Sequence, residues 1–216
     1  MAAVEPLAPA ERGAVLAELR TRCLEGRASG ALRPAGLATG FASLDAVLPG
    51  GGWPRGAVTE LLGERAGIGE LSLLLPALIA LARAGRTLAC VAPPHLPYAP
   101  ALQQAGLPLE RLLWLPLDPS REALWAAEQL LRCPAVGAVL LWPAVIDERQ
   151  VRRLQLAAET GGGSAWLYRP AQAAEAPSPA ALRLRLHACA DGLRIEILKS
   201  RGRHAHALVV HPVAAA

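Results

Sequence analysis

Thr59-Glu-Leu-Leu-Gly-Glu-Arg-Ala-Gly-Ile-Gly-Glu-Leu-Ser-Leu-Leu-Leu75 is the stretch around which this chain is organised. It opens as an apolar segment of strand length, turns at three closely spaced glycines and continues as a mostly apolar helix. A strand, a glycine-rich turn and a helix in this order are typical of the phosphate loop of nucleoside triphosphatases, whose pattern is G-x-x-x-x-G-K-[ST].

The residues of this turn are wrong for phosphate binding. In a phosphate loop, backbone N–H groups and a helix N-terminus hold the phosphates, the lysine contacts the outer phosphates and the hydroxyl binds Mg²⁺. Counted from Gly63, the last three positions of the pattern hold Ile68, Gly69 and Glu70, and shifting the frame to Gly69 puts Glu70 and Leu71 at the contact positions. A carboxylate there repels the anion. The sequence therefore predicts a degenerate phosphate loop without cofactor or metal, made of Gly63, Gly67, Ile68, Gly69 and Glu70.

Composition narrows the class of protein. At 216 residues and 53% hydrophobic content, the chain fits one well-buried domain and excludes a disordered protein. Four scattered cysteines without a C-x-x-C predict no zinc site. The net charge of +4 is modest, and the longest apolar run, 71–82, is too short to span a membrane. With no N-terminal signal, we expect a cytoplasmic protein.

The periodicity of the chain predicts an α/β fold. Residues 1–36 are expected to form an N-terminal amphipathic helix and a linker, with Leu16 and Leu19 on an apolar face that either packs on the main domain or docks a partner. In 37–216, strand-length apolar runs alternate with helical patterns, which predicts a mostly parallel, twisted sheet flanked by helices. Three alternating segments, 182–187, 193–197 and 207–211, predict an antiparallel edge at the C-terminal end.

The densest basic cluster of the chain lies between the last two of these segments. It contains Lys199, Arg201 and Arg203. Two interpretations stay open: a solvated hairpin turn, and a surface that contacts the DNA backbone or an acidic protein.

Two motifs carry a resemblance to known families. The run T-G-F-x-x-L-D-x-x-L-x-G-G-G-W-P-x-G at 39–56 resembles the opening of the RecA/RadA recombinase core. The run E-L-L-G-E-R-A-G-I-G-E-L-x-L-L-L-P-A-L at 60–78 resembles ImuA, a family of RecA-like proteins encoded beside error-prone polymerases. The resemblance spans about 37–211 and implies a RecA-like core with a degenerate phosphate loop.

The resemblance also marks what an ATPase of this fold would need. A RecA-like enzyme has an acidic residue after its second strand and an aspartate for Mg²⁺ after the strand at 136–142, where this chain has Pro93-Pro94-His95 and Trp142. With the phosphate-loop lysine and hydroxyl also absent from the sequence pattern, every element for phosphoryl transfer is lost. We therefore expect a protein that is not an enzyme and uses the fold as a scaffold.

The function that the ImuA resemblance implies is SOS-induced mutagenic translesion DNA synthesis. Its implied partners are an inactive Y-family polymerase-like subunit of the ImuB type, indirectly a DnaE-type error-prone polymerase, and RecA. Weak DNA binding would fall to the basic cluster.

Two alternatives lead to other functions. SulA-type cell-division inhibitors share a reduced form of this fold, lack a phosphate loop and act by binding FtsZ, but are shorter and lack the T-G-F-x-x-L-D opening. A recombinase-like ATPase with a variant loop would bind ATP with Mg²⁺ through the turn at Gly67 and Gly69.

Overall fold

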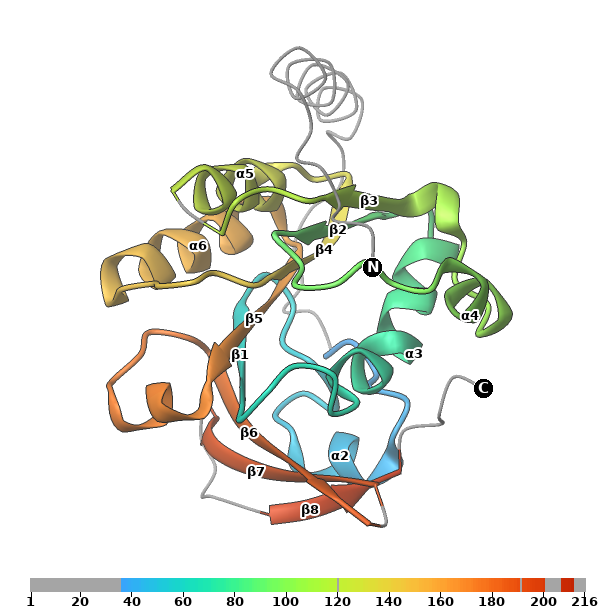
Figure 1. The fold of residues 1–216 in the computed structure, drawn as a ribbon, viewed down its shortest axis with the longest axis vertical. Coiled ribbons are helices and arrows are strands. Elements are labelled where there is room, and N and C mark those ends of the chain that lie inside the picture. The colour runs from blue at the N-terminus through green and yellow to red at the C-terminus, as the bar shows by residue number, and fades with distance from the viewer. Residues whose placement is uncertain (1–35, 120, 191, 201–206, 212–216) are drawn as a thin grey trace.

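The computed structural model describes residues 36–119, 121–190, 192–200 and 207–211 (Figure 1). Within these ranges the strands form a single sheet in the order β3-β2-β4-β5-β1-β6-β7-β8. The strands are β1 (Val58–Gly63), β2 (Thr87–Val91), β3 (Leu112–Leu115), β4 (Val136–Leu141), β5 (Ser164–Pro170), β6 (Leu182–Cys189), β7 (Gly192–Ser200) and β8 (Ala207–Val210).

The sheet is mostly parallel, as predicted. All pairings from β3 across to β6 are parallel, and β6–β7 and β7–β8 are antiparallel. The mixed α/β class and the antiparallel C-terminal edge are therefore confirmed. The prediction that 182–187 belongs only to that edge is incomplete, because β6 also pairs parallel with β1 and so joins the two parts of the sheet.

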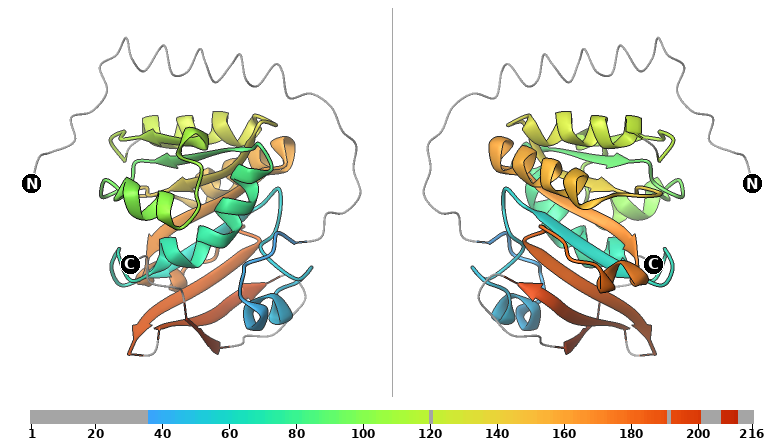
Figure 2. Two further views of the ribbon diagram at one scale, coloured as in Figure 1. Left: turned by 90° about the vertical axis from the view of Figure 1, so that its right-hand side faces the viewer. Right: turned by 90° about the vertical axis from the view of Figure 1, so that its left-hand side faces the viewer.

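Helices cover both faces of the sheet, as the two views of Figure 2 show. One face carries α2 (Ala42–Val47), α3 (Glu70–Arg83) and α4 (Ala99–Gln104), and the other carries α5 (Arg121–Arg132) and α6 (Glu148–Gly161). Two short 3-10 helices, η1 (Leu109–Arg111) and η2 (Ala171–Glu175), complete the fold. Alternation along β1 shows why both faces are covered: Val58 packs toward α5 and α6, and Leu61 toward α3.

Local sequence signals fix the start of α6. Asp147 Oδ1 accepts a hydrogen bond from the Gln150 backbone N–H (2.7 Å), and Gln150 Oε1 accepts one from the Asp147 N–H (2.8 Å). This capping box satisfies two amides at the start of the helix. Asp147 is therefore the capping residue of α6.

The T-G-F-x-x-L-D opening has a packing role. Asp45 Oδ1 accepts a hydrogen bond from the Thr39 N–H (2.9 Å), which ties α2 to the preceding turn. Gly40 has a φ of +87°, and a Cβ on it would lie 2.5 Å from Pro76 of α3. Trp53, fully buried, meets Trp166 of β5 edge to face with 5.9 Å between the ring centroids. The opening thus closes the α3 side of the core.

Several predictions fall outside the described ranges. The N-terminal helix with Leu16 and Leu19 lies there, as do Arg201 and Arg203. Among the residues that the structure does describe, no helix is both long and apolar enough to cross a membrane.

Candidate functional site

The glycine-rich turn between β1 and α3 is folded around the side chain of Glu70. Gly67 (φ +82°) and Gly69 (φ +103°) adopt left-handed conformations that favour glycine, and Gly69 is the N-cap of α3. Glu70 reaches back over the turn: its Oε1 accepts a hydrogen bond from the Gly67 N–H (2.7 Å), and its Oε2 accepts one from the Ile68 N–H (2.8 Å). Glu70 is only 8% exposed.

This carboxylate takes the place that an anion would occupy at the turn. Free backbone N–H groups at a helix N-terminus attract phosphate through their hydrogen bonds and the helix dipole. Here the amides of Gly67 and Ile68, just before the helix, are bound by the Glu70 carboxylate of the chain itself, and its negative charge also offsets the helix dipole. Sequence reasoning identified Glu70 as a repulsive residue; its hydrogen bonds to the turn were missed.

The end of β4 is aromatic. Trp142 stacks on Tyr168 of β5, with ring centroids 4.3 Å apart and planes 4° from parallel. The Tyr168 hydroxyl is buried without a hydrogen-bond partner among the described atoms. Burial, and then the charges of Glu70 and Cys90, raise the pKa of Tyr168 well above its ordinary value. The position of the Mg²⁺ aspartate in the recombinase pattern therefore lies in an aromatic stack.

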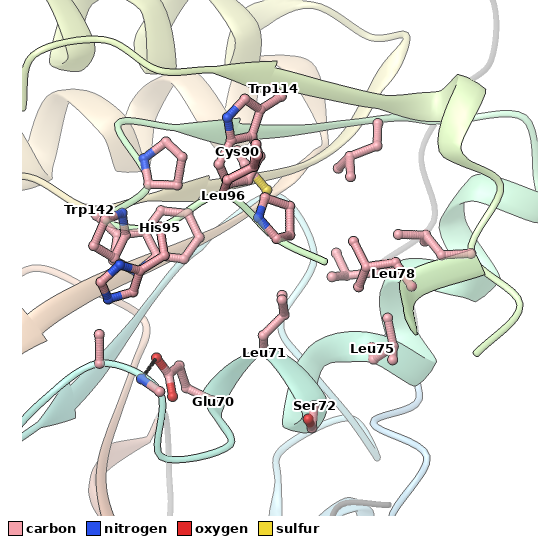
Figure 3. A pocket seen from close by; sticks show the side chains of 18 of the residues that line it. Glu70, Leu71, Ser72, Leu75, Leu78, Cys90, His95, Leu96, Trp114 and Trp142 are labelled. Carbon is pink, nitrogen blue, oxygen red and sulfur yellow. Dashed lines mark hydrogen bonds between the residues drawn. The ribbon is translucent and has the colours of Figure 1, made fainter. Parts of the chain in front are cut away.

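A cavity of about 330 Å³ lies above the start of α3 (Figure 3). Leu71, Leu75 and Leu78 of α3 form one wall in the figure, opposite Trp114 and Cys90 of the sheet. Glu70 lies at its base in the figure. The loop after β2 also lines the cavity, and its exposed residues Pro94, His95 and Leu96 form the rim. A second cavity of about 260 Å³ adjoins it and shares Ala66, Glu70, Pro94 and Trp142.

His95 lies on this exposed rim, where the recombinase pattern has an acidic residue. Burial raises the pKa of Cys90 to about 12, which keeps its thiol protonated. No group of His, Cys, Asp and Glu in the described part of the chain could hold a metal ion.

A buried ion-pair network lies on the face of β1 that points away from the two cavities, toward α5 and α6. Glu60, which is fully buried, accepts hydrogen bonds from Arg169 of β5 (2.8 Å), Arg183 of β6 (2.6 Å) and Ser178 (2.7 Å). Arg183 also donates to the carbonyl oxygens of Ala173 (2.6 Å) and Ala176 (3.0 Å). Glu60 and Arg183 therefore fasten the segment 171–179 to the sheet.

The basic cluster is described only at Lys199. Its Nζ donates to the Ser178 carbonyl oxygen (2.7 Å), so this side chain also holds the segment 171–179. The structure brings Gly63, Gly67, Ile68, Gly69 and Glu70 together in one turn and places Lys199 elsewhere, on β7.

Comparisons with known proteins find similarity to SulA and to RecA. The model of a family described as "Cell division inhibitor SulA" matches residues 56–165. The cell division inhibitor SulA of Serratia marcescens is 29% identical over 119 residues, which are 55% of this chain and 71% of that protein. Protein RecA of Rubrobacter xylanophilus is 32% identical over 107 residues, which are 50% of this chain and 31% of that protein.

A solved structure gives a further likeness. The crystal structure of SulA from Pseudomonas aeruginosa shares 29% sequence identity and a TM-score of 0.43, with 52% of this chain and 97% of that chain covered.

The family-model match and the SulA relative overturn the ImuA assignment, and with it the translesion-synthesis function and the predicted ImuB-type, DnaE-type and RecA partners. The glycine-rich turn that suggested ImuA lies inside the region that the SulA model matches. The T-G-F-x-x-L-D opening precedes that region, and its side chains close the core. On sequence alone, this opening counts as a feature that SulA-type proteins lack. Because it lies outside the matched region, it does not argue against membership of the SulA family.

Proposed function

Because the chain belongs to the SulA cell division inhibitor family, whose model matches residues 56–165, we propose that it blocks cell division by binding FtsZ, without catalysis. FtsZ replaces the polymerase subunits as the proposed partner. We also propose that the protein acts in the cytoplasm, during the response to DNA damage.

The observation that supports a binding protein over an ATPase is the Glu70 carboxylate on the amides of Gly67 and Ile68. A triphosphate at this turn would have to displace a buried carboxylate that accepts two hydrogen bonds, and no lysine follows to attract it. Trp142 and Tyr168 fill the neighbouring strand ends with stacked rings, which supply no ligand for Mg²⁺. These features favour a protein that acts by binding a partner through its surface.

We further propose that the sheet is a reduced RecA-like core. The order β3-β2-β4-β5-β1, with helices on both faces and a turn at the end of β1, supports a common architecture. The 32% identity to a RecA over half of this chain also supports it. The recombination activity of RecA is not part of the proposal, since the matched region is less than a third of that protein.

The test is the effect of the purified full-length chain on FtsZ from the same organism. Increasing amounts of the chain should lower both the polymer sedimented in the presence of GTP and the rate of GTP hydrolysis. The two proteins should also co-elute in size-exclusion chromatography. Unchanged polymer and hydrolysis at an excess of the chain, with separate elution, would reject FtsZ as the partner.

The proposed absence of catalysis has its own test. Isothermal titration of the chain with Mg²⁺–ATP should give no saturable heat, and a RecA measured in parallel is the positive control. Saturable binding accompanied by phosphate release would show that the chain is an ATPase.

A further inference from the structure

We infer that the 330 Å³ cavity above Glu70 is a binding site for one small, neutral, aromatic molecule. The inference is independent of FtsZ binding and concerns the place where an ATPase of this architecture would hold its nucleotide.

Position and size are the first argument. The cavity lies at the carboxyl ends of β2 and β4, where Cys90 and Trp142 stand, and this edge of a parallel sheet is the usual place for a ligand. Its volume is at the lower end of the range of small-molecule pockets. It therefore suits a molecule of two or three rings.

The walls argue for an apolar ligand. Leucines of α3 and the rings of Trp114 and Trp142 line the cavity, and such surfaces bind flat hydrophobic molecules through burial and ring stacking. Trp142 is held in place by its stack on Tyr168, so one aromatic wall is already fixed. The buried thiol of Cys90, with its raised pKa, indicates a poorly solvated environment.

Charge argues for a neutral ligand. The amides of Gly67 and Ile68 in the turn donate their hydrogen bonds to the Glu70 carboxylate. Glu70 also lines the cavity. The positive end of α3 is thereby neutralised, and an incoming anion would meet a carboxylate. A phosphate or carboxylate ligand is thus disfavoured at the base of the cavity.

The rim argues that the cavity is preformed. Pro93, Pro94 and Pro97 each fix their own φ, so the loop after β2 has little freedom to collapse inward. Leu96, between them, is 64% exposed although its side chain is apolar. A stiff rim lowers the entropy lost when a ligand binds.

The experiment uses a matched pair of fluorescent probes. Phenylnaphthylamine is neutral, and anilinonaphthalenesulfonate has the same rings with one negative charge. Titrated into the full-length chain, the neutral probe should bind once per chain, about tenfold or more tightly than the anionic probe at the same site. Competition between the probes identifies binding at the shared site.

Two leucine variants locate the site. Leu71→Trp fills the cavity and should weaken binding of the neutral probe about tenfold or more. Leu156→Trp, the same change at a 53% exposed position on α6, should leave it unchanged. If the Leu71→Trp protein lacks a cooperative melt, Leu71→Phe provides the smaller filling. Equal binding of both probes, or equal binding by the Leu71 and Leu156 variants, would overturn the inference.

Discussion

At the scale of a single residue, Glu70 replaces an external ligand with a group of the chain. Its two carboxylate oxygens accept the N–H groups of Gly67 and Ile68 at 2.7 and 2.8 Å, in a turn that two left-handed glycines make possible. A charged carboxylate accepts stronger hydrogen bonds than a neutral acceptor does. Glu70 should therefore stabilise the turn that it also closes.

Glu70→Ala tests this role. Removing the carboxylate frees two amides, and we expect the free energy of unfolding to fall by about 1–3 kcal/mol. Sulfate should then restore part of the lost melting temperature, because the vacated amides resemble an anion site. Melting is measured in sodium sulfate and in sodium chloride of equal ionic strength.

The control for that experiment is Glu64→Ala, which removes an exposed carboxylate from the same turn. This variant and the unchanged protein should show the same small response to sulfate. A Glu70→Ala protein that responds to sulfate no more than they do would mean that the turn is not an anion cradle.

At the scale of the elements, Glu60 joins three strands and the segment 171–179. β1 contributes Glu60, β5 contributes Arg169 and β6 contributes Arg183, so one carboxylate holds two arginines at the centre of the sheet. The side chains are 0%, 15% and 7% exposed, which excludes most solvent screening.

Glu60→Ala should therefore be costly. It leaves two guanidinium groups poorly compensated in the interior, and we expect a loss of about 3–5 kcal/mol in the free energy of unfolding, measured by urea denaturation. Glu196→Ala breaks the more exposed pair with Arg185, whose side chains are 37% and 32% exposed, and should cost less than about 1 kcal/mol. Similar losses in the two variants would contradict the structural role of Glu60.

At the scale of the whole molecule, stability should fall in alkaline solution. Burial raises the pKa of Cys90 from 9.0 to about 12, so above pH 9 the unfolded chain releases a thiol proton that the folded chain retains. Stability is then lost as pH rises from 9 toward 12, by up to about 1.4 kcal/mol per pH unit for one group. Tyr168, whose pKa is also raised by burial, acts in the same direction.

The Cys90→Ala variant isolates the thiol. Its unfolding free energy, followed by urea denaturation at a series of pH values, should decline less steeply above pH 9 than that of the unchanged protein. Cys189→Ala, at an exposed thiol, is the matched control. Identical slopes for Cys90→Ala and the unchanged protein would show that Cys90 ionises as freely folded as unfolded.

The whole fold also shows which inferences the sequence supports. The apolar run at 136–142 predicts a strand, and β4 spans Val136–Leu141, because this signal is local. The capping box at Asp147 is equally local. The pairing of Glu60 with Arg169 and Arg183 depends on strands more than 100 residues apart in the chain, and no local pattern predicts it. The hydrogen bonds of Glu70 depend on a side-chain conformation that the glycine spacing only permits.

The ImuA assignment is wrong for a related reason. The turn after β1 lies within the region matched by the SulA model, and a RecA also matches half of the chain, so the glycine spacing alone does not separate these groups. The opening at 39–56 drew the assignment toward recombinases, although its residues pack against α3 and β5.

The internal carboxylate has a consequence for control. A protein driven by nucleotide hydrolysis alternates between nucleotide-bound and nucleotide-free conformations, and its cycle stops when the nucleotide is withdrawn. Here the group that occupies the turn is the Glu70 carboxylate, which is covalently part of the polypeptide and therefore does not dissociate. On the proposed function, an inhibitor built this way would have no nucleotide to release from the turn, so a cell would control its activity through synthesis and degradation of the protein.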